Sequence, residues 1–434
     1  MNTEVSPITL PADARRHWRR IQSVLPTGVA QLILQAIGFA TGLLVIRLLP
    51  LQEYAYYTVV NAALGTMTLL SDSGISQSML AEGGKAWEDP RSLGGVVAAG
   101  LLLRRRFALA ALIVTMPVMF LMLRRQGAAG GTALLLVASI VPLFITSLTT
   151  QILQIVPRLH QRVLPMQYIL MSSAGLRLAL TAAGLLVGPV AWMANICAGL
   201  AQAWCNVRMR LLSGGLADLR TPPDPAASAA IWKLVRRSLP NAVYYAFEGQ
   251  LTIWLIALFG KVQAIAQVGA LNRLSVAFNV FSGVLSIIWL PRLARLRPGI
   301  QVLRQFWLLQ ICLVALLATV VAAVAAFPRI VLAVLGSAYE SLTQEIVLSA
   351  AAGALGLLAG STYYAAAARG VVITPWFVIP FAICLQCTLI IVLPVSTVSG
   401  LLWLSIINNL AFWGCHAFNF LIRLRVDETQ RFQG

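Results

Sequence analysis

The stretch SLPNAVYYAFEGQLTIWLIALFG (238–260) is long enough and apolar enough to cross a lipid bilayer, yet Glu248 lies near its middle. A bilayer-spanning helix needs about 20 mostly apolar residues. An ionised carboxylate at that depth costs at least about 2.5 kcal/mol unless it is paired, hydrated or protonated. The stretch therefore predicts a membrane protein and marks Glu248 as a candidate functional residue.

The composition of the whole chain also indicates a protein that lies in lipid. Of the 434 residues, 59% are hydrophobic and only 11% are charged, whereas soluble domains carry about 25% charged residues. The net charge of +18 fits lysines and arginines gathered in the loops on one side of a membrane, so we expect no nucleic-acid partner. The three histidines lie far apart, and we predict no metal site.

Apolar runs of about twenty residues predict an all-α integral membrane protein with about twelve transmembrane helices. Most of the 32 lysines and arginines then fall in loops on the side of the N-terminus, which predicts that both termini are cytoplasmic. The predicted spans are 26–49, 54–78, 94–123, 131–156, 166–187, 189–211, 238–259, 264–290, 304–326, 344–368, 371–393 and 396–422.

The spans divide into two bundles of about six helices that enter in the same orientation. SGGLADLRTPPDPAASAA (213–230) is rich in Pro, Gly and Ala and is typical of a linker. Leu25–Pro26 and Leu239–Pro240 open the first and seventh spans, which indicates a parallel repeat, an arrangement found in carriers. The predicted parts are a cytoplasmic N-terminal segment (1–25), an N-lobe (26–212), a cytoplasmic linker (213–230), a C-lobe (231–422) and a cytoplasmic tail (423–434).

Polar residues recur at helical spacing along one face of several spans. Small and amide residues of this kind often hold neighbouring membrane helices together. A shared aqueous cavity accounts better for one polar stripe on each of so many spans. The residues predicted to face that cavity include Gln31, Gln35, Asn61, Asn241, Tyr245, Asn272 and Asn279.

Ionisable residues at depth are the sharper signal, because their burial against lipid is costly. Arg177 is the deepest base, Arg273 lies partway in, and Arg47 lies near the outer end of the first span. Glu248 either pairs with a cavity arginine or binds a coupling cation, and a purely structural buried ion pair is the alternative to both. No nucleotide-binding motif is present, so we expect no cofactor and expect the work to come from H⁺, Na⁺ or the membrane potential.

The segments RLLPLQEYAYY (47–57) and SDSGIS (71–76) carry a family resemblance. They resemble the ends of the first two spans of the oligosaccharide flippases of polysaccharide biosynthesis, in the multidrug/oligosaccharidyl-lipid/polysaccharide exporter superfamily. Pro50 and Ala55 stand where that family usually has glycines. The resemblance covers the whole chain, including its length and central linker.

The resemblance implies a V-shaped, two-lobed bundle in the bacterial inner membrane. It implies alternating-access flipping of a polyprenyl-pyrophosphate-linked oligosaccharide from the cytoplasmic to the periplasmic leaflet, with membrane lipids, a polysaccharide polymerase and glycosyltransferases as partners. Functional residues vary in this family, and none is carried over by position. The alternatives are an ion-coupled multidrug exporter of the same superfamily and a membrane-embedded polymerase or glycosyltransferase.

Overall fold

The computed structural model describes residues 12–275, 278, 281–282, 285, 289, 293, 300–369 and 373–431, and the regular elements in these ranges are all helices. Eight of the helices are long and apolar enough to cross a membrane, or nine if one bent pair forms a single span. Helices satisfy their backbone hydrogen bonds internally, which lipid requires. The predicted all-α membrane fold is confirmed.

The N-terminal half of the chain, residues 12–214, folds into eight helices. Between the second and third helices, Ser73 and Gly74 adopt left-handed backbone conformations (φ 38° and 86°), so the SDSGIS segment forms a sharp break. The helices are α1 (Ala12–Leu48), α2 (Leu51–Asp72), α3 (Ile75–Ala86), α4 (Pro90–Arg125), α5 (Gly130–Leu153), α6 (Ile155–Leu159), α7 (Val163–Val187) and α8 (Ala191–Gly214).

Helix α4 has a strong start signal. The Asp89 carboxylate caps it by accepting hydrogen bonds from the backbone N–H groups of Arg91 and Ser92, and Pro90 occupies the first turn. The hydroxyl and backbone N–H of Ser92, followed by the N–H of Arg91, lower the pKa of the Asp89 carboxyl. These signals begin the helix at residue 90, four residues before the predicted span.

The C-terminal half begins with a helix that breaks inside the bundle. α9 ends at Glu248, the next helix starts at Leu251, and the two are bent by 50° across Gly249 and Gln250. The described helices are α9 (Pro225–Glu248), α10 (Leu251–Phe259), α11 (Val262–Ser275), α14 (Ile300–Ala326), α15 (Pro328–Leu335), α16 (Thr343–Ala368), α17 (Pro375–Val392) and α18 (Val398–Arg431), with the 3₁₀ helix η2 (Ser337–Tyr339).

The segment that joins the halves runs along the start of α4. The Asp218 N–H donates to the Pro90 carbonyl (2.8 Å) and the Asp224 N–H to the Gly95 carbonyl (3.2 Å). A Cβ at Gly94 would lie 2.0 Å from the Asp218 carbonyl oxygen, so only glycine permits this approach. Non-helical backbone is confined to 215–224, because α8 and α9 extend into both ends of the predicted linker.

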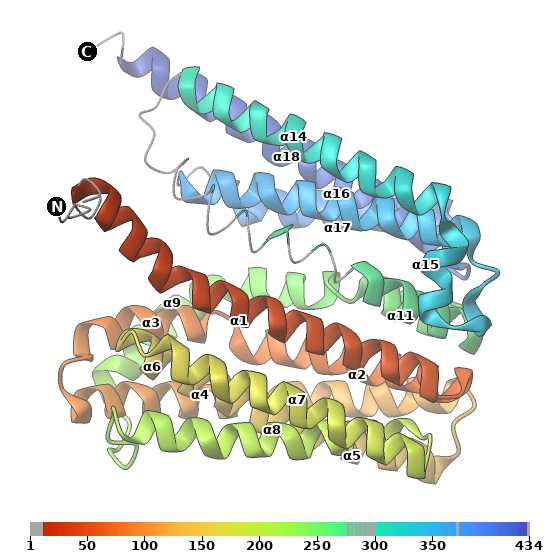
Figure 1. Ribbon diagram of the computed structural model, residues 1–434, viewed down its shortest axis with the longest axis horizontal. Helices are drawn as coiled ribbons and strands as arrows, with labels where there is room; N and C mark the ends of the chain where they lie inside the picture. Colours follow the sequence, from red (N-terminus) through yellow and green to blue (C-terminus); the bar gives the residue numbers. More distant parts are fainter. Residues whose placement is uncertain are drawn as a thin grey trace, which may run out of the picture.

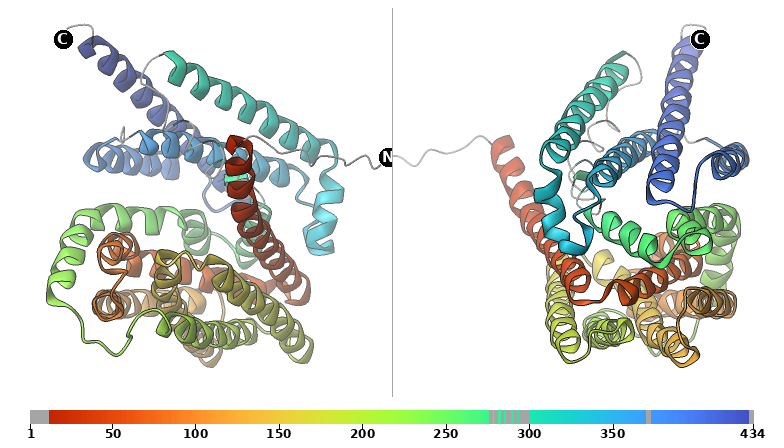
Figure 2. Two further views of the ribbon diagram at one scale, coloured as in Figure 1. Left: turned by 60° about the vertical axis from the view of Figure 1, so that its left-hand side comes forward. Right: turned by 90° about the vertical axis from the view of Figure 1, so that its right-hand side faces the viewer.

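The halves are joined at the end of the bundle opposite the termini. There the Arg47 guanidinium donates to the Ala333 and Val334 carbonyls of α15 (3.0 Å each), and the Gln126 amide donates to the Ala257 carbonyl of α10 (2.6 Å). Toward the termini, α14 and α18 diverge from the N-terminal half (Figure 1), and the second views show the same separation (Figure 2). The bundle is therefore closed at one end and splayed at the other.

Helix α9 is the exception to this separation, because its first half packs on the N-terminal half of the chain. Ile231 and Val235 are completely buried in an apolar cluster that includes Ile75 of α3 and Val97 of α4. α9 also contacts α2. α9 thus connects the two halves at the splayed end.

Helices α2 and α11 of the two halves approach each other closely at Gly269. A Cβ at this position would lie 2.3 Å from Thr58 Oγ1 and 2.7 Å from Thr58 Cγ2. We expect Gly269→Ala to lower the free energy of unfolding by about 1–3 kcal/mol through overpacking, measured by unfolding of the purified protein in detergent.

The companion substitution Thr58→Ala removes both clashing atoms and should restore most of the loss in the double variant. Gly84→Ala is the matched control, since a Cβ at Gly84 meets nothing within 4 Å. Equal stability of the Gly269 and Gly84 variants would contradict the close approach.

Candidate functional site

A cavity of about 570 Å³ lies where the two halves meet. Helix α2 supplies one wall, and the α9–α10 break together with α11 supplies the other. Its lining is polar for a site within a membrane bundle. The lining residues are Tyr54, Thr58, Asn61, Ala62, Gly249, Gln250, Thr252, Ile253, Gly269, Asn272 and Arg273.

Arg273 crosses from the C-terminal half to the N-terminal half inside this cavity. Its guanidinium carbon lies 6.0 Å from the centroid of the Tyr57 ring, a cation–π distance. Its side-chain stem lies against α1, where a Cβ at Gly42 would be 3.4 Å from Arg273 Cδ. Arg273, which was predicted to face a cavity, is among the residues that line this one.

Arg177 of α7 also lies near Tyr57. Both Arg177 and Arg273 interact with the Tyr57 side chain. The buried Nε of Arg177 has no hydrogen-bond partner among the described residues. An unsatisfied buried donor is unusual and marks a place where an acceptor can bind.

The two arginines have no acidic partner in the described part of the chain. The ion pairs found there are Lys85–Glu82 and Arg104–Asp72. The described residues that line the cavity include no Asp or Glu. The site between the halves is therefore cationic and suited to an anionic group that arginine can hold with two parallel hydrogen bonds.

The uncharged lining residues differ in the hydrogen-bonding groups that they leave available to a ligand. Asn61 donates from Nδ2 to the Tyr57 carbonyl of its own helix (2.8 Å), which leaves its amide oxygen as an acceptor. Asn272 lines the cavity as predicted. Tyr54, Thr58 and Gln250 were not predicted. Tyr54 and Thr58 share one helix face with Asn61 at i, i+4 and i+7, and this spacing in the sequence could have identified them.

Glu248 faces a second cavity, of about 360 Å³, inside the C-terminal half. Its walls combine this one carboxylate with aromatic rings from α9, α16 and α18. The lining residues are Tyr245, Glu248, Gly356, Ala359, Gly360, Tyr363, Tyr364, Asn409, Phe412 and His416. A carboxylate among aromatic faces is an environment that favours a cation.

Amide hydrogen bonds hold the Glu248 carboxylate in place. Asn408 Nδ2 donates to Glu248 Oε1 (3.2 Å), and Gln386 Nε2 donates to Asn408 Oδ1 (3.4 Å) and to the Tyr244 hydroxyl (3.1 Å). Within the described ranges no arginine pairs with Glu248. Of the two roles considered for Glu248, pairing with a cavity arginine has no support here, and cation binding stays a hypothesis.

Four other predicted site residues, Arg47, Gln31, Gln35 and Asn241, are not among the residues that line either cavity. The Arg47 guanidinium is occupied by the two α15 carbonyls, so it joins the halves at the closed end. Gln31 is exposed and Asn241 half-buried, while Gln35 Oε1 is buried without a hydrogen-bond partner in the described residues. Asn279 falls outside the described residues.

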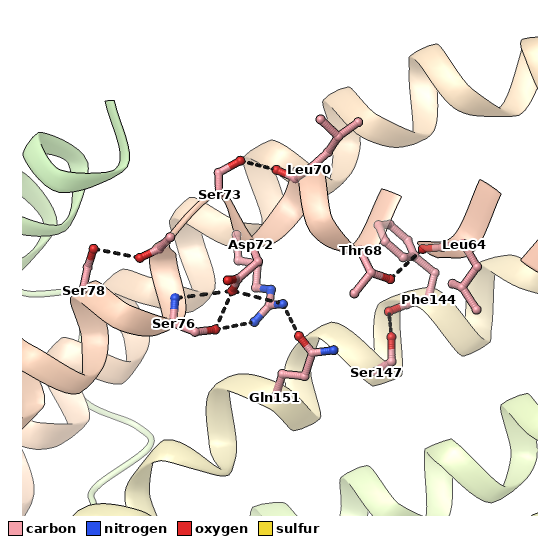
Figure 3. A network of polar contacts seen from close by, with 12 residues as sticks. Leu64, Thr68, Leu70, Asp72, Ser73, Ser76, Ser78, Phe144, Ser147 and Gln151 are labelled. Carbon is pink, nitrogen blue, oxygen red and sulfur yellow. Dashed lines mark hydrogen bonds and ion pairs between the residues drawn. The ribbon is translucent and has the colours of Figure 1, made fainter. Parts of the chain in front are cut away.

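A buried polar network beside the α2–α3 break was not predicted (Figure 3). Arg104 of α4 is 1% exposed and forms an ion pair with Asp72 (3.4 Å). It also donates to Ser76 Oγ (3.4 Å) and to Gln151 Oε1 of α5. The network ties four helices together around one guanidinium.

Comparisons with known proteins support the fold alone. No protein-family model and no curated protein matches the chain. A multidrug resistance MATE family transporter of the MOP superfamily is similar in structure: its inward-facing form has a TM-score of 0.66 at 13% identity over 95% of this chain and 100% of that one. An outward-facing structure described as a multidrug resistance MATE family transporter of the same superfamily has a TM-score of 0.58 at 12% identity over 93% of this chain and 95% of that one.

A MOP superfamily transporter from Pyrococcus furiosus is also similar, with a TM-score of 0.57 at 12% identity over 92% of this chain and 94% of that chain. It is described as having a binding pocket of reverse polarity that suggests a different function. The chain thus shares the fold of MATE transporters of the MOP superfamily. The oligosaccharide flippase family expected from the sequence is not among these matches.

Proposed function

We propose that the chain is an alternating-access transporter of the bacterial inner membrane, with both termini in the cytoplasm. Support comes from a fold shared with transporters solved in inward- and outward-facing forms. The halves are joined by Arg47 and Gln126 at the end opposite the termini, so this arrangement corresponds to an inward-open state. Lysines and arginines concentrated in the loops on the side of the termini support the orientation.

The cargo that we favour has an anionic head group, such as the pyrophosphate of a polyprenyl-linked oligosaccharide. The observation that carries this choice is the pair Arg177 and Arg273, which converge on Tyr57 beside a cavity without an acidic residue. An inside-negative potential favours outward movement of an anion by about 2.3 kcal/mol per charge per 100 mV. The hydroxyl and amide groups of the lining suit a glycan.

Export of cationic drugs is the second candidate, and the names of the structural neighbours fit it better. The observation within this chain that favours it is the aromatic cavity around Glu248. The two candidates use different cavities and opposite charges. They can therefore be separated by a direct comparison of substrates.

The deciding experiment reconstitutes the purified protein in liposomes. One arm measures protein-dependent flipping of a polyprenyl-pyrophosphate oligosaccharide, and the other measures ion-gradient-driven movement of a cationic dye. Flipping of the anionic lipid without dye transport supports the first candidate. Dye transport without flipping supports the second, and activity toward neither contradicts both.

In cells, depletion of the protein should confine lipid-linked glycans to the cytoplasmic leaflet if the first candidate holds. A polymerase and glycosyltransferases would then act before and after the flipping step.

Glu248→Gln tests ion coupling by the second cavity. Glutamine keeps the volume and the acceptor for Asn408 Nδ2 but cannot carry the charge that attracts a cation. We expect transport driven by a proton or sodium gradient to fall at least about tenfold, as expected for loss of a charged partner. Glu340→Gln, at an exposed acid between α15 and α16, is the control, and unchanged gradient dependence in the Glu248 variant would make that residue structural.

A further inference from the structure

A third cavity, of about 440 Å³, opens on the outer surface of the bundle between α4 and α9. It is distinct from the two cavities above and shares no lining residue with them. Its walls are apolar except for one arginine and one serine. The lining residues are Ala99, Leu102, Leu103, Arg106, Phe107, Ala110, Ser228 and Trp232.

The length of α4 places this groove at the membrane surface. From Arg106 to Arg124, near the far end of α4, the helix rises about 27 Å at about 1.5 Å per residue. That rise matches the hydrocarbon thickness of about 30 Å. Arg106 therefore lies at the head-group level of the leaflet that faces the termini, and Phe107 and Ala110 lie one turn deeper.

Trp232 of α9 supports the same depth. Its ring is 46% exposed and packs against Phe107, with ring centroids 6.2 Å apart. Tryptophan is enriched at the membrane–water interface because one edge is polar and the rest apolar. The groove thus has an interfacial rim and an apolar floor that continues into the acyl-chain region.

The charge at the rim is positive and unpaired. Arg106 is exposed and has no hydrogen bond or ion pair with any described residue. Because side chains lean toward the N-terminus of their helix, Arg106 leans toward the head groups. The nearby acid on α9, Asp224, is already engaged by the N–H groups of Ala226 and Ala227. Arg105 on α4 and Lys233, Arg236 and Arg237 on α9 are also exposed.

We propose that this groove is a binding site for an anionic phospholipid. The phosphate group pairs with the Arg106 guanidinium, and one acyl chain follows Phe107, Ala110 and Trp232 into the bilayer. The lipid bridges α4 of the N-terminal half and α9, the first helix of the C-terminal half. It thereby stabilises the packing of α9 on the N-terminal half at the splayed end, whatever the cargo.

The test uses the full-length protein in detergent, with native mass spectrometry to count bound lipid and thermal unfolding to detect stabilisation. Dioleoyl phosphatidylglycerol is the anionic probe and dioleoyl phosphatidylcholine the zwitterionic one. We expect the anionic lipid to bind at least about tenfold more tightly, since hydrogen bonds to charged groups are the strong ones. Inorganic phosphate should not displace it, because the acyl chain contributes to binding; displacement would instead indicate a simple anion site.

The variants separate a built site from diffuse charge. Arg106→Gln should abolish the preference for the anionic lipid, while Arg106→Lys should keep part of it and report that the surface is intact. Arg105→Gln is the matched control, because Arg105 is an exposed neighbour on the same helix that does not line the groove. Ala110→Phe leaves the charge unchanged and fills the groove, so it should weaken binding of both lipids.

Three results would overturn the proposal. Equal binding of the two lipids removes the role of charge. An Arg105→Gln loss as large as that of Arg106→Gln shows non-specific attraction to the surface. Undiminished binding in Ala110→Phe shows that the groove is not where the chain lies.

Discussion

Arg273→Gln is expected to reduce flipping of an anionic lipid-linked substrate by about 100-fold or more. The guanidinium is the cationic group that lines the cavity between the halves, and glutamine cannot offer its two parallel donors to a phosphate. Leaving one partner of a desolvated charge pair alone costs about 3–5 kcal/mol, which corresponds to about two to four orders of magnitude. The measurement is the initial rate of protein-dependent flipping in liposomes.

Lys261→Gln provides the matched control for this prediction. Lys261 is an exposed cation of the same half, one residue before α11, and it does not line the cavity. It should change the rate by less than about twofold, as expected of a surface charge worth at most about 1 kcal/mol. Equal losses in the two variants would show that overall positive charge, and not the cavity, supports transport.

Arg177→Gln extends the same argument across the halves. Because Arg177 and Arg273 both interact with Tyr57, their effects should be non-additive in a double-variant cycle. Additive losses would indicate that the two groups act at separate steps. An anionic substrate whose flipping tolerated both changes would leave the cationic cavity without a function and favour the exporter.

Hydropathy was sufficient to predict the fold class, whereas residue depth and spacing supplied candidates for the site. Apolar runs of this length are required by the lipid environment, whatever the packing of the helices. They therefore predicted the membrane helices even where Gly249 breaks one of them. Depth along a span identified Arg177, Arg273 and Glu248, because buried charge is costly wherever the helix packs.

The distribution of these residues between cavities could not be predicted, because it depends on which helices become neighbours. Arg177 and Arg273 are 96 positions apart in the chain, yet both interact with Tyr57. Glu248 points into its own half, where Asn408 holds it, and spacing along one helix cannot show this. Arg47 was placed at the correct end but binds carbonyls of α15, a contact that no local pattern indicates.

Arg104 shows the same limit for a structural residue and leads to the second large effect. The run Arg104–Arg106 lies within the predicted span 94–123. Arg105 and Arg106 are exposed there, whereas Arg104 turns into the bundle. Its partners are Asp72 and Ser76 at the α2–α3 break and Gln151 of α5. Which of three adjacent arginines points inward depends on where α2 and α5 pack.

Asp72→Asn should lower the free energy of unfolding by about 3–5 kcal/mol, because it leaves a buried guanidinium without its counter-ion. Arg104→Met should cost less. The side chain of Asp72 is 29% exposed and that of Arg104 only 2%, so water can solvate the carboxylate left behind but cannot reach the guanidinium. The double variant Asp72→Asn/Arg104→Met should therefore be more stable than Asp72→Asn alone, since removing the arginine removes the uncompensated charge.

Unfolding of the purified protein in mixed micelles, followed by helix content, provides the measurement. Glu82→Gln is the control, because Glu82 pairs with the 72% exposed Lys85 within one helix and such pairs contribute about 0.5 kcal/mol or less. If Asp72→Asn were no more destabilising than Glu82→Gln, water would reach Arg104 and the network would not stabilise the fold at the α2–α3 break. If Arg104→Met proved the worse of the two single variants, packing of the arginine stem, and not its charge, would hold α2, α3, α4 and α5 together.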